Sequence, residues 1–597
     1  MEQNKLELMR HSCAHLVAAA VAELYPDAKF GVGPVVENGF YYDIDFSTPI
    51  GEEDLKNIEN KARELAKSGV KFEQSEMSLD EAIKFFGDRG QKYKVELLND
   101  LKNKGTTKVK DEEMNDVAGS VDKATIYTTG NFVDLCRGPH LDSAKEIGSF
   151  KLTKLAGAYW RGKSENPQLQ RIYGVCFATK GELAEYLHMM EEAEKRDHRK
   201  IGMEQDLFFF DDKVGKGLVM WTANGVVIRN EIEKLAVEKE NEAGYVRVRT
   251  PHLAKEEMYL TSGHLPYYKD SMYPAMVMDD GTYYLKAMNC PHHHTIYNHN
   301  LHSYRDLPVR IAEYGECYRN ELSGTLAGLL RVRCMAMNDA HMYCRKDQIK
   351  DEFRGVIELT INYFKIFGLE NYWFRLSKWS SDHLDKYVNQ PENWEYSENI
   401  LREVLQEMKV KFVEADNEAA FYGPKVDVMF KSIVGREETM STVQLDFVAK
   451  ERFGLKYTDE TGKENNDVFV IHRAPLSTHE RFLAFLIEHY AGIWPVWMSP
   501  VQVLLAPVSE SHLEGAKALA KEFIKLNIRV EVDGANETIG KKVRNAAKRK
   551  IPYIVVVGDK ELGGEPWTIR VRGQEEQVKM SMEEFVRKVE EEIKERR

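Results

Sequence analysis

Histidine and cysteine side chains near the N-terminus have the spacing of a metal site. His11 and His15, in RHSCAHL, lie four residues apart and share one face if the segment is helical. Cys136 and His140 show the same spacing in CRGPH, after a strand-like run. Four Cys and His groups from two elements can hold zinc, so spacing alone predicts a metal site. A metal-free hydrolytic site and a helix that simply carries two histidines are the alternatives.

A second set of residues, in the middle of the chain, suits nucleotide chemistry. In ECYRNELSGTLAGLLRVR, a predicted strand ends at Arg319 and Glu321, a loop follows, and a second strand carries Arg331. Activation of a carboxylate with ATP needs a fixed cation at the α-phosphate, where charge builds up, and an acceptor for the adenine amino group. Glu480 and Arg481 open a predicted helix further along the chain. A surface ion pair is the simpler explanation of any one such pair taken alone.

The chain that carries these sets is long, globular and acidic. Its 597 residues predict about three to four domains, and its hydrophobic content of 43% is that of a globular protein. The N-terminus does not resemble a signal peptide, and no apolar run approaches the roughly 20 residues that cross a bilayer, which predicts a cytoplasmic protein without membrane contact. Seven cysteines, thinly spread, do not suggest a disulfide framework. The net charge of −13 argues against nucleic-acid binding through the whole surface, although residues 541–550 contain six cations.

Changes of rhythm along the chain divide it into four predicted parts. Residues 1–182 alternate strand-like runs with polar helices, and residues 183–204 form a linker helix. Residues 205–499 begin with a helix and continue with strands that favour a large, mostly antiparallel sheet. In residues 500–597, apolar strands alternate with helices, which indicates a small α/β domain with a mixed sheet. The predicted fold class is therefore multidomain α+β.

Three pieces of the middle part resemble the signature motifs of class II aminoacyl-tRNA synthetases, in their usual order. They are the strand that ends at Pro251, the element with Arg319 and Glu321, and the helix that carries Arg481. The resemblance implies a catalytic domain on an antiparallel sheet, with a dimer interface at the first motif. It also implies that Arg319 holds the α-phosphate of ATP, Glu321 reads adenine and Arg481 clamps the γ-phosphate, with Arg331 also at the nucleotide and Mg²⁺ accompanying ATP.

The words MNCP, NDAH and HRA narrow the resemblance to the threonyl-tRNA synthetase family. In that family they carry one cysteine and two histidines that bind zinc in the catalytic site, here Cys290, His341 and His472. Such a set leaves room on the metal for substrate. By resemblance, threonine binds through its amino group and its side-chain hydroxyl. Valine lacks the hydroxyl, and sites built to ligate a hydroxyl discriminate by about 10⁴ or more.

Further residues of the middle part match family positions that contact substrate, adenylate or tRNA: Asp339, Tyr422, Lys425, His264 and Gln444. The resemblance implies that the aspartate accepts a hydrogen bond from the bound substrate and that the tyrosine and lysine line the adenylate pocket. It also implies that the histidine accepts the proton in transfer to the tRNA ribose and that the glutamine lies near the terminal adenosine. The chain departs from the usual pattern at Met337 and Thr439, where glutamines are common, and at Ser477, where a glycine is usual.

The N-terminal part resembles the editing domain of the same family. Serine carries the same amine and hydroxyl as threonine, and one methyl group is worth only about 1–3 kcal/mol, so a second site hydrolyses seryl-tRNA. The resemblance implies a hydrolytic set without metal: His11, His15, Asp134, Cys136 and His140, with Tyr42, Lys110 and Tyr127 as pocket residues. Related editing domains of alanyl-tRNA synthetases hold zinc with a similar set, so a metal stays the alternative. Cys13 is expected to serve helix packing.

Residues 500–597 resemble the anticodon-binding domain of class IIa synthetases. Arg570 and Arg572, in TIRVRG, match the strand that reads the anticodon, and Glu537 is a further candidate. A basic segment on an acidic protein suits a tRNA-reading module. The resemblance covers essentially the whole chain, although family members usually carry a ubiquitin-like domain before the editing domain.

The resemblance implies a homodimeric ligase with one catalytic zinc ion per subunit. It would activate L-threonine with ATP and Mg²⁺, load tRNA(Thr), and hydrolyse seryl-tRNA(Thr). Two other functions fit part of the pattern: a stand-alone seryl-tRNA editing hydrolase, and an RNA-binding regulator derived from a synthetase. The complete set of expected zinc ligands and phosphate-binding arginines argues against both.

Overall fold

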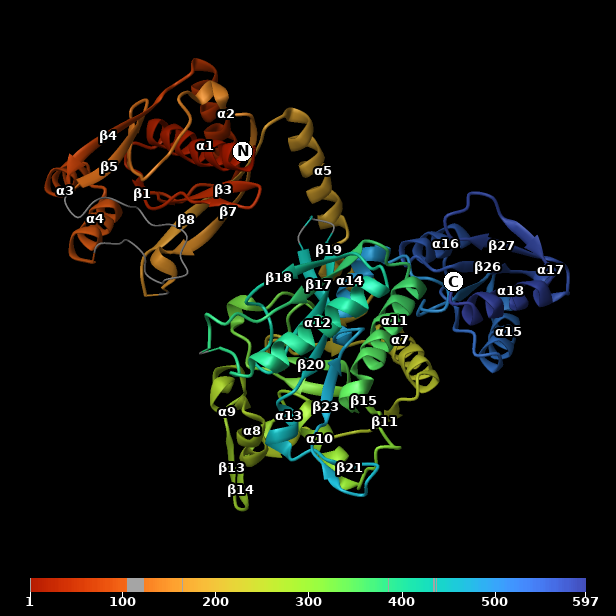
Figure 1. Ribbon diagram of the computed structural model, residues 1–597. Helices are drawn as coiled ribbons and strands as arrows, with labels where there is room; N and C mark the ends of the chain where they lie inside the picture. Colours follow the sequence, from red (N-terminus) through yellow and green to blue (C-terminus); the bar gives the residue numbers. More distant parts are fainter. Residues whose placement is uncertain (1, 105–122, 164, 385, 433–434, 436) are drawn as a thin grey trace. The chain divides into compact units, whose positions relative to one another are not determined.

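The computed structural model describes residues 2–104, 123–163, 165–384, 386–432, 435 and 437–597, and it divides into two compact units (Figure 1). The first unit comprises residues 1–191 and the second residues 192–597. Two helices, α5 (Lys180–Lys195) and α6 (His198–Glu204), occupy the predicted linker. The boundary between the units falls inside α5.

The first unit packs two long helices against antiparallel strands. Helix α1 (Glu2–Leu24) is rich in alanine and contains neither glycine nor proline, which suits a long helix. Its side chains from Cys13 to Val21 are at most 3% exposed, and α2 (Glu52–Ser68) packs against it. In the described residues, one sheet has the order β1–β3–β8–β7 with β2 beside β3, and the other has the order β4–β5–β6.

The elements of this unit follow one another along the chain with short connections. The strands are β1 (Lys29–Phe30), β2 (Val35–Val36), β3 (Gly39–Asp45), β4 (Phe72–Ser78), β5 (Lys123–Thr129), β6 (Phe132–Leu135), β7 (Ser149–Tyr159) and β8 (Gln168–Phe177). Helices α3 (Leu79–Asp88) and α4 (Lys92–Lys104) lie between β4 and β5 in the chain and pack on each other.

The second unit is built on a large sheet in the order β11–β15–β16–β23–β20–β19–β17–β18. Its described pairs are antiparallel except for β11 with β15 and β17 with β18. A mostly antiparallel sheet was predicted, and it is confirmed. The strands are β11 (Val246–Arg247), β15 (Val309–Tyr318), β16 (Cys334–Cys344), β17 (Tyr372–Ser377), β18 (Phe412–Ala415), β19 (Lys425–Lys431), β20 (Glu437–Asp446) and β23 (Phe469–Arg473).

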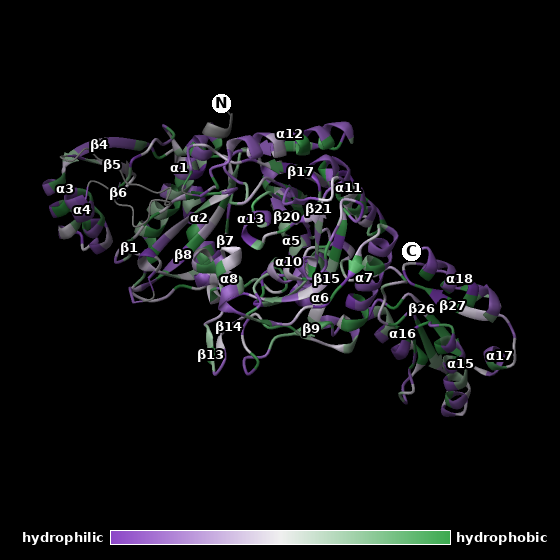
Figure 2. Ribbon diagram, turned by 60° about the horizontal axis from the view of Figure 1, so that its bottom comes forward, coloured by the Kyte–Doolittle hydropathy of each residue, from purple (hydrophilic) through white to green (hydrophobic). Residues whose placement is uncertain are grey.

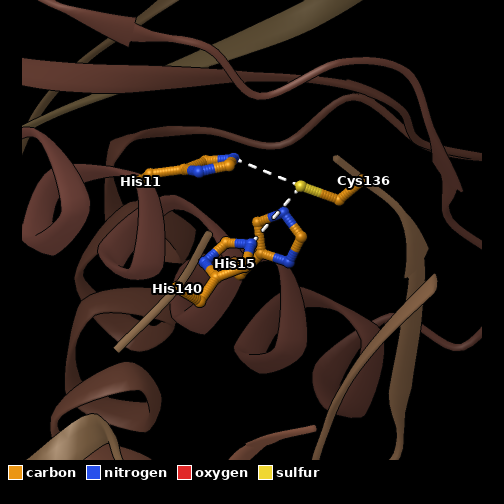
Figure 3. Close-up of side chains that lie close together, drawn as sticks. All are labelled: His11, His15, Cys136 and His140. Atoms are coloured by element: carbon orange, nitrogen blue, oxygen red, sulfur yellow. Dashed lines mark hydrogen bonds between the residues drawn. The ribbon is translucent and has the colours of Figure 1, made fainter. Parts of the chain in front are cut away.

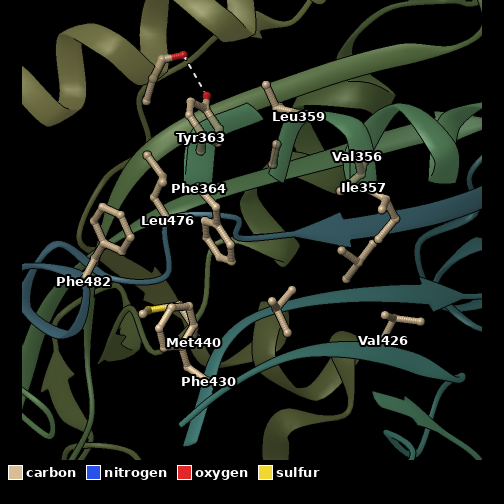
Figure 4. Packing of buried hydrophobic residues seen from close by; sticks show 14 of the residues in the cluster. Val356, Ile357, Leu359, Tyr363, Phe364, Val426, Phe430, Met440, Leu476 and Phe482 are labelled. Atoms are coloured by element: carbon tan, nitrogen blue, oxygen red, sulfur yellow. Dashed lines mark hydrogen bonds between the residues drawn. The ribbon is translucent and has the colours of Figure 1, made fainter. Parts of the chain in front are cut away.

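The main hydrophobic core joins this sheet to four helices: α7 (Ala223–Glu242), α11 (Ile349–Ile366), α12 (Pro391–Glu407) and α14 (His479–Tyr490). Figure 4 shows Tyr363 and Phe364 of α11 near Phe482 of α14 and Phe430 of β19. In α11, the buried residues recur every three to four positions, so one apolar stripe faces the core. This packing fixes the sheet that carries the candidate site.

The C-terminal part forms a smaller sheet in the order β25–β24–β26–β27–β28. Strands β25 (Val530–Val532), β24 (Val503–Pro507) and β26 (Tyr553–Val557) are parallel, whereas β27 (Trp567–Val571) and β28 (Val578–Met580) are antiparallel. Helices α15 (Leu513–Lys525), α16 (Ile539–Lys548) and α18 (Met582–Lys594) accompany the strands. Figure 2 shows hydrophilic residues along helices such as α12 and α18. The mixed α/β domain and the multidomain α+β class are confirmed.

Among the helices of the described residues, none combines the length and the apolar character needed to span a bilayer. The seven cysteines are all free thiols.

Candidate active site

Three potential metal ligands converge where two central strands meet a helix. His341 on β16 lies directly opposite His472 on β23 in the antiparallel register, and Cys290 is the first residue of α10 (Cys290–His299). The sulfur of Cys290 and one nitrogen of each imidazole lie within 4.8 Å of one another. A thiol and two imidazoles at this spacing fit the set that zinc accepts while it keeps a position open for substrate.

Neighbouring groups hold the two imidazoles. Nδ1 of His341 lies 2.7 Å from Nδ1 of His293, and Nε2 of His472 lies 3.1 Å from a carboxylate oxygen of Asp446. Burial lowers the pKa of His341 well below its ordinary value, so the ring is neutral and offers a lone pair. Burial raises the pKa of the Cys290 thiol, so a cation is needed to stabilise its thiolate.

A cavity of about 650 Å³ borders the three ligands. The structure brings most of the predicted nucleotide and substrate residues of this domain into its lining: Arg319, Glu321, Arg331, Asp339, Tyr422, Gln444 and Arg481. The three departures from the family pattern, Met337, Thr439 and Ser477, line it as well. Asn289, the residue before Cys290, donates a hydrogen bond of 3.0 Å to Asp339 and so orients that carboxylate.

The arginines of this cavity differ in how their charges are balanced. Arg331 forms a salt bridge of 2.8 Å with Glu321. Arg319 and Arg481 have no ion pair within 4 Å in the described part of the chain. Thr478 caps α14 by accepting a hydrogen bond of 3.1 Å from the Arg481 backbone, and this places Arg481 in the first helical turn. Two uncompensated guanidinium groups in one cavity suit the binding of a polyphosphate.

The remaining predicted residues of this domain lie next to the cavity. His264 lines a smaller hollow of about 40 Å³ together with Cys290 and His472, and its Nδ1 lies 2.6 Å from the Ser262 hydroxyl. Burial lowers the pKa of His264 from 6.5 to about 4, so the ring is neutral at pH 7 and can accept a proton. Lys425 lies opposite Gln444 in the register of β19 and β20.

The four Cys and His residues of the N-terminal pattern lie together in the first unit (Figure 3). The sulfur of Cys136 is 3.3 Å from Nε2 of His11 and 3.3 Å from Nε2 of His140. One ligand atom from each of these three residues and from His15 lies within 4.8 Å of the others. Burial lowers the pKa of the three histidines and raises that of Cys136 to about 12. The neutral set fits a metal ion, and it equally fits a water held by imidazoles.

A buried lysine that sequence reasoning missed completes this site. Lys94 on α4 is 3% exposed, contacts the Asp134 carboxylate and lies 3.3 Å from the Tyr42 hydroxyl. The same hydroxyl donates a hydrogen bond of 2.5 Å to Asp134, which lies 3.5 Å from Nε2 of His15. A signal was available, because charged residues are rarely buried without a partner and the helical stripe around Lys94 is otherwise apolar: Tyr93, Leu97, Leu98 and Leu101.

Other predicted residues of the first unit have simpler surroundings. The ring of Tyr127 on β5 packs 4.4 Å from that of His140, and its hydroxyl donates a hydrogen bond of 3.0 Å to Gln74. Cys13 is 0% exposed in the interior of the unit. Lys110 lies outside the described residues.

The three predicted anticodon residues of the C-terminal domain differ in their accessibility. Arg570 on β27 is exposed. Arg572 donates two hydrogen bonds of 2.6 Å to the backbone carbonyls of Lys550 and Trp494, which gives it a structural role in the free protein. Glu537 forms a salt bridge of 2.7 Å with Lys541.

Glu480, the neighbour of Arg481, carries a buried carboxyl group whose titration should affect stability. Burial raises its pKa from 4.5 to about 7, although Arg229 works in the opposite direction. A raised pKa in the folded state stabilises the fold below the unfolded-state pKa, and this stabilisation is lost as the pH rises toward the folded-state value. We expect Glu480→Gln to flatten the fall in Tm between about pH 5 and about pH 8, measured by thermal unfolding. An equal fall in both proteins would contradict the buried ionisation.

Comparison with known families agrees with this division of the chain. Residues 275–490 match the family described as tRNA synthetase class II core domain (G, H, P, S and T), and residues 502–592 match the anticodon binding domain. Residues 124–173 match the threonyl and alanyl tRNA synthetase second additional domain. Each matched segment contains residues of the corresponding site.

Relatives of known name match almost the whole chain. The threonine–tRNA ligase of Geobacillus sp. (strain WCH70) is 47% identical over 590 residues, which cover 99% of this chain and 89% of that protein. A Listeria monocytogenes threonine–tRNA ligase is 46% identical over 98% of this chain and 89% of its own length. A solved structure of the RNA binding domain of threonyl-tRNA synthetase from Cryptosporidium parvum has a TM-score of 0.63 and 31% identity, covering 66% of this chain and 98% of that one. Identity at this level over nearly the full length, with a matching order of domains, makes this chain a member of the threonine–tRNA ligase family, as predicted.

Proposed function

We propose that this chain activates threonine with ATP, transfers it to tRNA(Thr), and hydrolyses seryl-tRNA(Thr) at a second site. One observation carries the proposal: the cluster of Cys290, His341 and His472 borders the same cavity as two uncompensated arginines, Arg319 and Arg481. An amino acid held at the cluster and a triphosphate held by the arginines would share that cavity. Attack of the carboxylate on the α-phosphorus then becomes a reaction within one complex.

The chain's own residues have defined parts in adenylate formation. Arg319 binds the α-phosphate, where negative charge increases in the transition state, and Arg481 binds the γ-phosphate. Glu321 accepts a hydrogen bond from adenine, and its salt bridge to Arg331 keeps it in place. Asp339, oriented by Asn289, accepts a hydrogen bond from the threonine amino group. Mg²⁺ accompanies ATP and neutralises part of the phosphate charge.

The cluster of Cys290, His341 and His472 would hold zinc, because one thiol and two neutral imidazoles form a set that leaves a position open. When bound, zinc supplies a Lewis acid for an amine and a hydroxyl on the same substrate. In the transfer step, His264 accepts the proton of the terminal ribose hydroxyl through Nε2, since its Nδ1 is engaged by Ser262. Gln444 and Tyr422, which contact each other, line the path to that ribose.

Seryl-tRNA hydrolysis belongs to the first unit and proceeds by an oriented water. Neutral His11, His15 and His140 can each accept a hydrogen bond from that water or take its proton. The Lys94 ammonium, held by Asp134, places a positive charge beside the cluster, where the ester oxygen becomes negative. This cation makes a metal unnecessary for stabilising the oxyanion.

Two further properties complete the proposal. Exposed apolar side chains at the first motif support a homodimer, in which a second copy covers Val246 on the edge strand β11, 56% exposed, and Val226 on α7, 39% exposed. Free thiols at all seven cysteines suit the reducing cytoplasm. The exposed Arg570 is available to contact the anticodon.

Threonine-dependent exchange of pyrophosphate into ATP tests the proposal. We expect zinc-loaded protein to catalyse exchange with threonine, to use serine with a kcat/KM lower by about 10–200-fold, and to discriminate against valine by about 10⁴ or more. An editing hydrolase or an RNA-binding regulator would catalyse no exchange. Absence of exchange with threonine in zinc-loaded protein would therefore reject the ligase function.

A further inference from the structure

Two residues behind the metal cluster form a buried chain of hydrogen bonds to one of its ligands. His293 on α10 is 0% exposed, and its Nδ1 lies 2.7 Å from Nδ1 of His341. Its other nitrogen, Nε2, lies 3.3 Å from Oε2 of Glu313 on β15. Glu313 is 3% exposed. The chain therefore runs from a carboxylate through one imidazole to a second imidazole that faces the cavity.

The chemistry of these groups fixes which atoms carry hydrogen. A carboxylate only accepts hydrogen bonds, so Nε2 of His293 must donate to Glu313. With one hydrogen on each ring, Nδ1 of His293 then has a lone pair and accepts the Nδ1–H of His341. The nitrogen of His341 that keeps a lone pair is consequently Nε2. Glu313 thus determines the tautomers of both rings.

Glu313 is itself anchored from a third part of the chain. It accepts hydrogen bonds of 2.7 Å from the Thr250 backbone and 2.8 Å from the Thr250 hydroxyl. Lys286 donates to the same hydroxyl at 2.8 Å and lies 3.9 Å from the carboxylate. Burial alone would raise the pKa of Glu313, but hydrogen bonds from His293 and Thr250 and the charge of Lys286 lower it to about 2. The acceptor at the end of the chain is therefore an ionised, immobilised carboxylate.

We propose that Glu313 and His293 are positioning residues that fix the tautomer and orientation of His341 as a metal ligand. Partners of this kind hold a ligand ring in its binding geometry and make its free nitrogen more basic. The inference rests on the zinc site of the proposed function, and it adds two residues that touch neither metal nor substrate. Both lie outside the words MNCP, NDAH and HRA.

Zinc affinity tests the proposal independently of catalysis. The variants are His293→Phe, which keeps a ring but removes both hydrogen bonds, and Glu313→Gln, which keeps the shape but removes the charge. The matched control is His292→Phe, because His292 is also buried on α10, at 5% exposed, and neither of its ring nitrogens has a hydrogen-bond partner among the described residues. Each full-length protein is titrated with zinc against a chromophoric chelator, and KM for threonine is measured separately from kcat.

We expect His293→Phe to weaken zinc binding by about 10–100-fold and Glu313→Gln by about tenfold, with His292→Phe close to the wild type. His293→Asn should bind zinc with intermediate affinity, because its amide oxygen can accept from His341 but cannot reach Glu313. KM for threonine should rise in parallel with the loss of zinc affinity, whereas a packing defect would lower Tm in all variants without this order.

Unchanged zinc affinity in a folded His293→Phe protein would overturn the proposal. If that variant does not fold, unchanged affinity in Glu313→Gln overturns it instead. A wild-type protein that binds no zinc at its Cys290 cluster would reject the zinc site of the proposed function together with this inference. That failure appears before any variant is made, so the two results are distinguishable.

Discussion

Replacement of Arg319 by alanine is expected to lower kcat for threonine-dependent pyrophosphate exchange by about 10²–10³-fold. The residue follows β15 directly and lines the large cavity without an ion pair within 4 Å in the described residues. Its charge is therefore available for the α-phosphate, where negative charge grows in the transition state. Because no salt bridge is lost, the Tm of the variant should stay near that of the wild type. Stopped exchange assays at saturating ATP and threonine measure the effect.

Two further variants separate charge from geometry. Arg319→Lys should retain part of the rate, since a lysine keeps the charge but loses the planar fork that binds phosphate oxygens in pairs. Arg354→Ala is the matched control, because Arg354 lies on α11 and forms salt bridges of 2.9 Å with Asp351 and 2.6 Å with Glu407, away from the cavity lining. A kcat in Arg319→Ala that stays within about twofold of the wild type would remove this arginine from the transition state.

The second large effect concerns the first unit. We expect the double variant His11→Ala, His15→Ala to slow hydrolysis of seryl-tRNA(Thr) by about 10²-fold or more, because both rings that orient the water are lost. Threonine-dependent pyrophosphate exchange should remain unchanged, since that reaction belongs to the other compact unit. Deacylation of isolated seryl-tRNA, followed by release of labelled serine, measures the first rate.

Cys13 provides the control for this experiment. It lies between the two histidines in α1 and is 0% exposed, but it is not part of the cluster around Cys136. Cys13→Ala should therefore lose some stability and retain hydrolysis. Wild-type deacylation by the double histidine variant would show that the cluster does not act on the ester.

Periodicity and composition predicted the architecture well where they depend on local chemistry. The apolar strands between residues 500 and 597 predicted a mixed sheet, and the structure has one. The strands of the central part predicted an antiparallel sheet, also present. The order β16–β23–β20 within that sheet was not predictable, because pairing between strands so distant in sequence depends on side-chain packing across the whole domain.

The same distinction applies to the sites. The spacing of His11 and His15 was visible in the sequence, whereas Cys290, His341 and His472 share no local motif and were identified by family resemblance. Their convergence depends on a strand register that sets two of them opposite each other. Lys94 was missed because nothing in its own segment names the partner, Asp134, that lies on β6. His293 was passed over since three consecutive histidines do not indicate which one touches a ligand.

The distribution of ligands along the chain has a consequence for biosynthesis. The cluster around Cys136 and its lysine lie wholly within residues 1–191, a compact unit. The other cluster needs His472, on one of the last strands of the central sheet. Since domains generally fold in the order in which they leave the ribosome, the deacylating site can close while the aminoacylating site still lacks a ligand. On each new polypeptide the means of correction is therefore assembled before the source of the error.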